Sequence, residues 1–391
     1  MNTTELRRIV GAQNVSDSAD DLVVYRRDAS RLEGDCLAVV WPSQPPQVAA
    51  LVEWAQAAGV DLTPRGAGTG LCGGATPQRS VVVDLSRLNT VASIDPAGRT
   101  ARVGAGVVLE SLNRLLNVHD LFLPVVPGSR RAATIGGMIA TNAAGMRAVR
   151  YGSMRRWVQE LSLVDGRGRL VRIGGEELDD VVGREGVTGL IVEATVRLAP
   201  LPQRRTVSLF ADGDEDALAA RRNEWICDPR LTALEYLNRH AAAAIGWEPL
   251  PHLLGEFDSD GGELTDPEQI DAVWRARDGL YPVLAGRGYP VIEDPKLDAA
   301  GLSVLLPWLD TEAIPAFGHL GVGIIHPCFP PDDERIATLY GRVADLGGQV
   351  SGEHGVGLKK KAWTTARYRA EVRRLKDTYD PRGVLNRGKL C

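Results

Sequence analysis

The chain has 391 residues, of which 44% are hydrophobic and 24% charged, a composition typical of globular proteins. This length is too great for one compact core and predicts two or three domains. The net charge of −5 and the lack of a long Lys/Arg stripe argue against a nucleic-acid partner. The 43 glycines indicate many tight turns, or backbone that approaches a ligand closely.

The sequence shows no pattern for secretion or membrane insertion. Residues 1–10 carry three charged side chains and no apolar run, so we expect no signal peptide. No stretch of about 18 apolar residues predicts a membrane helix. The five cysteines are odd in number and widely spaced, which is typical of reduced thiols. We therefore expect a cytoplasmic protein, with peripheral docking to a membrane as an open alternative.

The first half of the chain predicts short strands separated by glycine turns. A strand at 37–41 ends at Pro42, and a helix over 46–58 ends at Gly59. One further helix is expected over 108–118. The other β runs are 81–85, 100–103, 160–164 and 190–196. Because these strands do not alternate regularly with helices, the pattern predicts an α+β fold.

The second half begins after Pro200 and Pro202, which indicate a domain boundary. Residues 206–310 mix strands and helices, and residues 313–358 return to strands and glycine turns. A charged amphipathic helix is expected over 364–378. The run Lys359–Lys361 is interpreted as a solvated helix face, with docking to an acceptor or a membrane as the alternative.

The densest feature of the sequence is a glycine loop at residues 64–74. Five of the nine residues from Gly66 to Gly74 are glycine, and successive glycines let backbone N–H groups converge on an anion such as pyrophosphate. The loop contains the pattern G-x-G-x-x-G, but a strand follows it, so a Rossmann fold is not expected. A flexible surface loop is the alternative. Two further glycine-rich segments, at 127–145 and 183–190, favour the cofactor interpretation.

These three segments, in this order and spacing, resemble the FAD-binding domain of the vanillyl-alcohol-oxidase-like flavoproteins. The likeness is to the D-lactate dehydrogenase, glycolate oxidase and D-2-hydroxyglutarate dehydrogenase branch, and it runs from Val39 to Lys389. The resemblance implies a two-subdomain FAD-binding domain of the PCMH type over residues 1–204. It also implies an α+β substrate (cap) domain with an antiparallel sheet over 205–375, which would carry the metal and catalytic residues. The tail, 376–391, would return to the flavin.

The same resemblance implies how FAD would be held. The first segment would bind the pyrophosphate, the second would line the flavin and its ribityl chain, and the third would flank the adenosine. Covalent members carry a His in or near the first loop, and this loop has none, so non-covalent FAD is expected. The implied cofactor-binding residues are Arg65, Gly66, Ala67, Gly68, Thr69, Gly70, Gly73, Gly74, Pro127, Gly128, Ser129, Thr134, Gly136, Gly137, Asn142, Gly145, Gly186, Gly189, Ile191 and Asn386.

A second feature is a group of histidines near the C-terminus. His319, His326 and the pair Glu353-His354 lie close in sequence, and two imidazoles with a carboxylate suit a divalent metal with open positions. On one regular strand His319 and His326 would face opposite sides, because their spacing is odd. One shared site therefore requires a turn or bulge, and the glycines between them favour one. Two unrelated structural histidines are the alternative.

The resemblance extends to this group of residues. By it, His319, His326 and Glu353 match ligands of a divalent metal such as zinc, manganese or iron. His354 matches the base that takes the substrate's hydroxyl proton. Arg277 matches an arginine that binds the substrate carboxylate, a task suited to a bidentate guanidinium.

Two positions depart from the family's pattern, since Val322 and Ile324 stand where it has Asp and Asn. The predicted function is FAD-dependent oxidation of a small 2-hydroxy acid, of the D-lactate or glycolate type, to the 2-oxo acid by hydride transfer to flavin N5. The electrons would pass to a quinone, a cytochrome, an iron–sulfur protein or an electron-transfer protein. The alternatives are a metal-independent enzyme acting on an alcohol or polyol, and a non-catalytic flavin subunit. A homodimer is compatible with the sequence.

Overall fold

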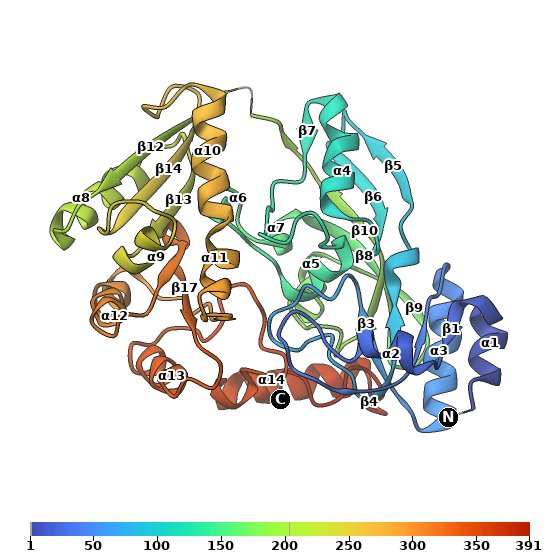
Figure 1. The fold of residues 1–391 in the computed structure, drawn as a ribbon. Helices are drawn as coiled ribbons and strands as arrows, with labels where there is room; N and C mark the ends of the chain where they lie inside the picture. The colour runs from blue at the N-terminus through green and yellow to red at the C-terminus, as the bar shows by residue number, and fades with distance from the viewer. Residues whose placement is uncertain (1, 203) are drawn as a thin grey trace. The chain divides into compact units, whose positions relative to one another are not determined.

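The computed structural model describes residues 2–202 and 204–391, and the chain forms two compact units. Unit 1 comprises the chain up to Ala143, Ser153–Leu201 and His354–Cys391. Unit 2 comprises Ala144–Gly152 and Pro202–Glu353. Residues 354–375, expected from the sequence in the substrate domain, thus pack in unit 1. Each unit mixes helices with sheets, which confirms the α+β fold class (Figure 1).

The strands of unit 1 build two main sheets. One is four-stranded in the order β1-β2-β4-β3, with β2, β4 and β3 parallel, and the other is antiparallel in the order β5-β6-β10-β8-β9. A short pair, β11-β7, lies apart from them. The strands are β1 (Val15–Ser16), β2 (Asp35–Val40), β3 (Asp61–Arg65), β4 (Gln78–Asp84), β5 (Val91–Asp95), β6 (Thr100–Gly104), β7 (Leu121–Phe122), β8 (Val158–Val164), β9 (Leu170–Gly174), β10 (Leu190–Arg197) and β11 (Ala199–Pro200).

The helices of unit 1 cover these sheets with their apolar faces. Helix α3 begins with prolines and ends at Gly59, whose φ of 64° is the left-handed conformation that glycine adopts readily at a helix end. The α-helices are α1 (Thr4–Val10), α2 (Ala19–Tyr25), α3 (Pro45–Ala58), α4 (Leu109–Leu116), α5 (Ile135–Thr141), α7 (Met154–Trp157) and α14 (Ala366–Tyr379). The 3₁₀ turns are η1 (Ala12–Asn14), η2 (Leu85–Arg87), η3 (Asn117–His119), η4 (Gly175–Asp180) and η6 (Lys361–Trp363).

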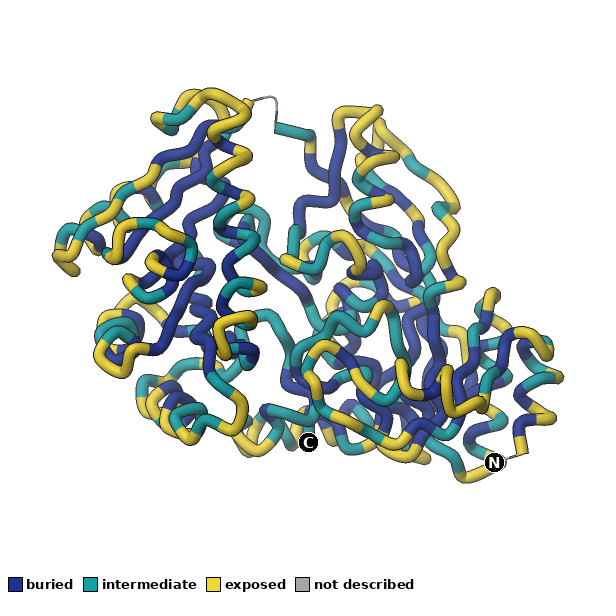
Figure 2. Tube along the Cα trace, in the orientation of Figure 1, coloured by how far each residue is buried: buried dark blue, intermediate teal, exposed yellow. Residues whose placement is uncertain are grey.

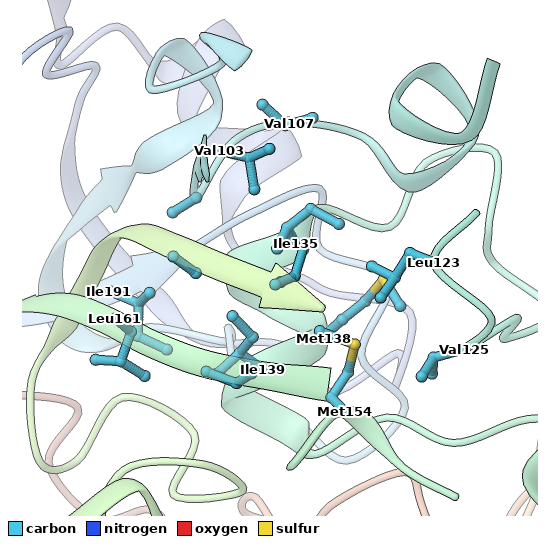
Figure 3. Packing of buried hydrophobic residues seen from close by; sticks show 14 of the residues in the cluster. Val103, Val107, Leu123, Val125, Ile135, Met138, Ile139, Met154, Leu161 and Ile191 are labelled. Carbon is cyan, nitrogen blue, oxygen red and sulfur yellow. The ribbon is translucent and has the colours of Figure 1, made fainter. Parts of the chain in front are cut away.

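A hydrophobic core joins α5 to the antiparallel sheet of unit 1. Ile135 and Ile139 of α5 are fully buried and belong to one cluster with Leu161 of β8 and Ile191 of β10 (Figure 3). The residues of this cluster lie in the buried interior, while the outward helix faces are exposed (Figure 2). This packing holds the second glycine-rich segment, which contains α5, against the sheet.

Unit 2 is built on one antiparallel sheet in the order β12-β14-β13-β16-β17-β15. Its strands are β12 (Arg205–Ala211), β13 (Leu231–Leu237), β14 (His252–Asp258), β15 (Val291–Ile292), β16 (Ala316–His319) and β17 (Ile324–Phe329). Its helices are α6 (Ala148–Tyr151), α8 (Glu215–Ile226), α9 (Arg239–Ala244), α10 (Pro267–Asp278), α11 (Leu280–Gly286), α12 (Ala299–Thr311) and α13 (Arg335–Asp345), with the 3₁₀ turn η5 (Leu320–Val322). Most residues of β13 and β17 are buried, so these strands form the centre of the unit.

One expectation about the surface is wrong. The run Lys359–Lys361 is not a solvated helix face, because Lys360 is fully buried and Lys361 begins the 3₁₀ turn η6, where its Nζ donates to the carbonyl of Gly388 at 2.9 Å. A run of like charges indicates exposure on average, but here the segment packs against the C-terminal residues. Among the helices of the described residues, none is long and apolar enough to cross a membrane.

Candidate active site

The three glycine-rich segments meet in unit 1. A Cβ on Gly66 would lie 2.3 Å from Oγ1 of Thr134, so the first segment touches the second. The N–H of Glu185 donates to a carbonyl at the end of α5 at 2.8 Å, which attaches the third segment to the second. A Cβ on Gly186 would lie 2.5 Å from the ring of Pro64. The third segment therefore closes back onto the first.

The C-terminal tail reaches the same place through Asn386. Its Nδ2 donates to the carbonyls of Gly74 at 2.9 Å and of Glu185 at 2.6 Å. Asn386 is 1% exposed, and its Oδ1 accepts no hydrogen bond from any described residue. A buried acceptor without a partner is costly. It is therefore suited to an N–H donor of a bound ligand.

The backbone of the first loop is open to an anion. The expected residues Arg65, Gly66, Ala67, Gly68, Thr69, Gly70, Gly73 and Gly74 lie at the end of β3 and in the loop that leads to β4. Within residues 2–202 and 204–391, no group accepts a hydrogen bond from the backbone N–H groups of residues 66–71. A Cβ on Gly70 would have one neighbour within 4 Å, an oxygen of Asp28 at 3.9 Å. A row of free amides with open space beside it fits a pyrophosphate, and so fits FAD.

The second segment is divided between helix and turn. Pro127, Gly128 and Ser129 form a turn closed by a hydrogen bond to the Pro127 carbonyl, and a Cβ on Gly128 would meet nothing within 4 Å. Thr134 caps α5 by accepting from the N–H of Gly137 at 3.3 Å. Open space next to the turn leaves room for a flat ligand against backbone.

Four other expected cofactor residues have structural contacts. Asn142 ends α5 in the left-handed conformation, with φ of 51°. A Cβ on Gly136 would lie 2.6 Å from the side chain of Ala105, and one on Gly189 would meet β8. Ile191 packs in the core of Figure 3. Gly145 differs from the other expected cofactor residues in belonging to unit 2.

Glu185 was not expected from the sequence but lies at the centre of this arrangement. Its carboxylate accepts from the N–H groups of Val356 at 2.6 Å and Gly357 at 3.1 Å. Burial raises the pKa of Glu185 to about 7, although these two donors and Lys389 act in the opposite direction. Burial also lowers the pKa of Lys389 to about 8. A glutamate inside a run of small residues was the signal that could have indicated a buried, bonded carboxylate.

In unit 2, a hairpin places two histidines on one face. Strands β16 and β17 are antiparallel, with Phe317 opposite His326 and His319 opposite Ile324. Opposite residues of an antiparallel pair share a face, and so do residues two apart on one strand. His319 and His326 are therefore diagonal neighbours, with ring centroids 5.1 Å apart. The turn between the strands reverses the chain, so two histidines at an odd spacing can share one face of the hairpin.

Glu353 completes a cluster with these histidines. Its Oε1 lies 3.2 Å from Nε2 of His319 and 3.2 Å from Nε2 of His326. One ligand atom from each of the three residues lies within 4.8 Å of the other two. Donor atoms of a tetrahedral zinc site are roughly 3.3–3.5 Å apart, given metal–ligand distances of about 2.0–2.2 Å. The donor set and its spacing therefore fit a divalent metal.

Other polar groups orient each donor of the cluster. Nδ1 of His319 lies 2.7 Å from Oε1 of Glu235, and Nδ1 of His326 lies 3.2 Å from the carbonyl of Glu293. These contacts direct both Nε2 atoms toward Glu353. The backbone N–H of Glu353 donates to Asp294 at 2.7 Å. Partners of this kind fix the tautomer of a histidine ligand and the direction of its ring.

The electrostatics of the cluster favour added positive charge. Burial lowers the pKa of His319, but Glu235 and Glu353 outweigh it and raise that pKa to about 9. Burial raises the pKa of Glu353, yet His319 and His326 hold it well below the usual value. The carboxylates thus stabilise a cation between them, and a divalent metal could replace the proton.

Arg277 belongs to the same buried group. It lies on α10 and its Nε donates to Oε2 of Glu235 at 2.6 Å, while its Nη2 pairs with the same oxygen. Its guanidinium carbon lies 4.9 Å from the centre of the Phe317 ring. Arg277 and the metal-ligand candidates are therefore brought together through Glu235. The sequence signal that could have identified Glu235 was a single glutamate inside the apolar strand 231–237.

His354 is half-buried and opens the C-terminal segment of unit 1. The peptide bond between Glu353 and His354 is therefore where the chain passes from unit 2 to unit 1. Two expected site residues that are adjacent in sequence thus belong to different units.

Comparisons with known proteins agree with this arrangement. The family described as "FAD binding domain" matches residues 36–174, and "FAD linked oxidases, C-terminal domain" matches residues 252–390. The chain is 31% identical to D-2-hydroxyglutarate dehydrogenase of Xanthomonas citri pv. viticola, over 98% of this chain and 96% of that protein. It is 28% identical to glycolate oxidase subunit GlcD of Bacillus subtilis, over 99% and 96% of the two chains. It is 29% identical to D-lactate dehydrogenase of Archaeoglobus fulgidus, over 90% of each.

Among solved structures, the chain is similar to alkyldihydroxyacetonephosphate synthase, with a TM-score of 0.70. That match covers 98% of this chain and 83% of the other, at 17% sequence identity. At this identity the likeness shows the fold alone.

Replacement of Gly323 should destabilise unit 2. Gly323 has φ of 75°, and a Cβ there would lie 1.9 Å from the carbonyl oxygen of Leu297, so Gly323→Ala forces backbone to move. Gly347→Ala is the matched control, because φ is 68° and the space is empty. We expect the control to cost about 1–2 kcal/mol from the left-handed conformation and Gly323→Ala to cost more. Thermal unfolding of both variants checks this, and equal losses would contradict it.

Glu185 should make stability depend on pH. Because its folded pKa is about 7 and its usual value is 4.5, its contribution to stability is fully present below pH 4.5 and is lost as pH rises through 7. In Glu185→Gln the amide oxygen can still accept from Val356 and Gly357, and this pH dependence should disappear. The measurement is Tm between pH 5 and 8, with Glu371→Gln as an exposed control. Parallel profiles for wild type and Glu185→Gln would refute the assignment.

Proposed function

The chain belongs to the family of FAD-linked oxidases, and on that premise we propose that it oxidises a small 2-hydroxy acid to the 2-oxo acid. The substrate would be of the D-lactate or glycolate type. The observation that carries the proposal is the buried group of unit 2, where Glu235 links Arg277 to His319, and His319 clusters with His326 and Glu353. A 2-hydroxy acid presents a carboxylate next to a hydroxyl, which are the groups that such a site recognises. The names of the similar proteins support the same substrate class.

Arg277 is proposed to bind the substrate carboxylate. Glu235 holds the guanidinium by Nε and Nη2, so the group keeps one orientation and has further N–H donors to offer. An oriented guanidinium binds a carboxylate through two parallel hydrogen bonds. This contact would select acids over simple alcohols.

His319, His326 and Glu353 are proposed to hold a divalent metal. Such an ion, when bound, lowers the pKa of a coordinated hydroxyl group and so eases its deprotonation. The three residues leave coordination positions for the substrate, since a catalytic site with three protein ligands keeps at least one position open.

His354 is proposed to take the hydroxyl proton. A neutral imidazole can accept the proton of a hydroxyl group in a general-base step. The glycine segments of unit 1 would hold FAD without a covalent bond, and the cofactor when bound would supply the acceptor for the hydride that leaves the α-carbon. Loss of one proton and one hydride converts the hydroxyl carbon to a carbonyl. The two electrons would then pass to a non-NAD acceptor such as a quinone, a cytochrome or an electron-transfer protein.

A second candidate is metal-independent oxidation of an alcohol or polyol. Ile324 is 2% exposed and Val322 half-buried, so two apolar side chains lie in the hairpin that carries both histidines. Apolar side chains at these two positions favour a less charged substrate. The two candidate functions differ in whether substrate oxidation requires a bound metal.

The proposed function is tested by anaerobic titration of the FAD-loaded protein. D-lactate, L-lactate, glycolate and D-2-hydroxyglutarate are added in turn while the visible flavin absorbance is recorded. We expect one acid to bleach the flavin, and prior treatment with a chelator to prevent it. Bleaching that survives the chelator would favour the alcohol or polyol enzyme. No bleaching by any of the acids would contradict the proposal.

Replacement of His354 should slow flavin reduction without loss of FAD. Removal of a general base typically costs 10²–10⁴-fold in rate, so His354→Ala should lower the reduction rate by about that factor. Stopped-flow absorbance with the acid found in the titration measures it. His119→Ala, at an exposed position of unit 1, serves as the control. A wild-type rate in His354→Ala would remove this residue from the mechanism.

A further inference from the structure

Glu235 is a buried carboxylate that contacts both parts of the proposed site. It lies on β13 with 0% exposure. Its Oε1 is 2.7 Å from Nδ1 of His319, and its Oε2 is 2.6 Å from Nε of Arg277. Each carboxylate oxygen therefore serves a different partner. One partner is the candidate metal ligand and the other is the candidate carboxylate-binding group.

The strand that carries Glu235 is held on both sides. Strand β13 pairs with β14, where Glu235 faces Leu254, and also with β16, where Tyr236 faces Gly318. A carboxylate is planar, so its two oxygens have a fixed separation and direction. The position of Arg277 relative to His319 is thus set by one rigid group on a central strand.

We propose that Glu235 is a positioning residue that couples the metal site to the carboxylate-binding site. It acts through His319 and Arg277 and need not touch the substrate itself. The inference rests on the proposed function, because it assumes that those two residues bind the metal and the acid. It goes further in making binding of metal and binding of acid depend on the same side chain.

The substitution Glu235→Gln separates this role from simple packing. The amide keeps the size of the carboxylate but replaces one acceptor with an N–H donor. If that donor faces Arg277, two donors meet and the guanidinium loses its support. If it faces His319, the ring must accept at Nδ1 and carry its proton on Nε2, which then cannot bind a metal. Either arrangement damages one of the two functions.

Glu256 offers a matched control in the same sheet. It lies on β14, is 1% exposed, and its carboxylate bridges Arg147 at 3.0 Å and Arg205 at 2.6 Å. Glu256→Gln thus removes the same charge from an equally buried bridge between two cationic side chains. The hydrogen bonds of Glu256 join it to Arg147, Arg205 and Thr232, and not to His319 or Arg277.

The experiment uses the full chain loaded with FAD, as wild type, Glu235→Gln and Glu256→Gln. Calorimetric titration of chelator-treated protein with Zn²⁺ measures metal binding, and flavin absorbance measures FAD content. Stopped-flow flavin reduction, with the acid found in the titration, gives the half-saturating concentration and the limiting rate. For Glu235→Gln we expect 10–100-fold weaker zinc binding, the range typical of partners that orient metal ligands. We also expect a raised half-saturating acid concentration with FAD content unchanged.

The Glu256→Gln control shows whether the losses in Glu235→Gln come from lost positioning or from lower stability. Glu256→Gln should lower Tm by a similar amount while zinc and acid binding stay as in the wild type. Equal zinc and acid losses in both variants, or wild-type binding in Glu235→Gln, would overturn the inference alone. A wild-type chain that binds neither Zn²⁺ nor any of the acids would overturn the proposed function, and the inference with it.

Discussion

An ionised carboxylate can be buried only when polar or charged partners replace its water, and this constraint shapes the core of unit 2. Glu235 is fully buried in the central sheet and is compensated by Arg277 and His319. Burial alone would raise the pKa of Glu235, but Arg277 and then His319 outweigh it, so the pKa is lowered. The partners are 42 and 84 residues away along the chain. The Glu235 carboxylate therefore holds both α10 and the β16–β17 hairpin at the same point on β13.

The same constraint has a different solution in unit 1. Glu185 has backbone N–H groups as its nearest donors, and Lys389 donates to a backbone carbonyl of Thr76. Burial raises the pKa of Glu185 and lowers the pKa of Lys389, and each shift favours the neutral form of the group. Lys389 thereby ties the C-terminal tail to Thr76, and Glu185 holds the backbone at Val356 and Gly357. This explains why the last part of the chain packs with the first unit, although most of unit 2 intervenes in sequence.

The sequence predicted the parts of the site better than their arrangement. Composition and spacing identified the glycine segments, because glycine density does not depend on tertiary contacts. Which residues touch, such as Gly66 and Thr134, depends on how sheets and helices pack. One regular strand would place His319 and His326 on opposite faces, and the glycines between them favoured a turn instead. The register of the hairpin places both histidines on one face. The prediction for Lys360 was wrong, because its charge predicted an exposed side chain and the side chain is buried.

Ile324 shows how an apolar residue can serve the proposed site without binding anything. It pairs with His319 across the hairpin, and its Cγ1 would lie 2.5 Å from a Cβ on Gly352. Its side chain thus packs against the backbone just before Glu353, while Asp294 holds that backbone by hydrogen bonds. Where the resembling family has a polar side chain, this chain combines apolar packing with a carboxylate from the β15 side. Support for Glu353 therefore does not require a polar group at position 324, and the proposed ligand set is compatible with apolar surroundings.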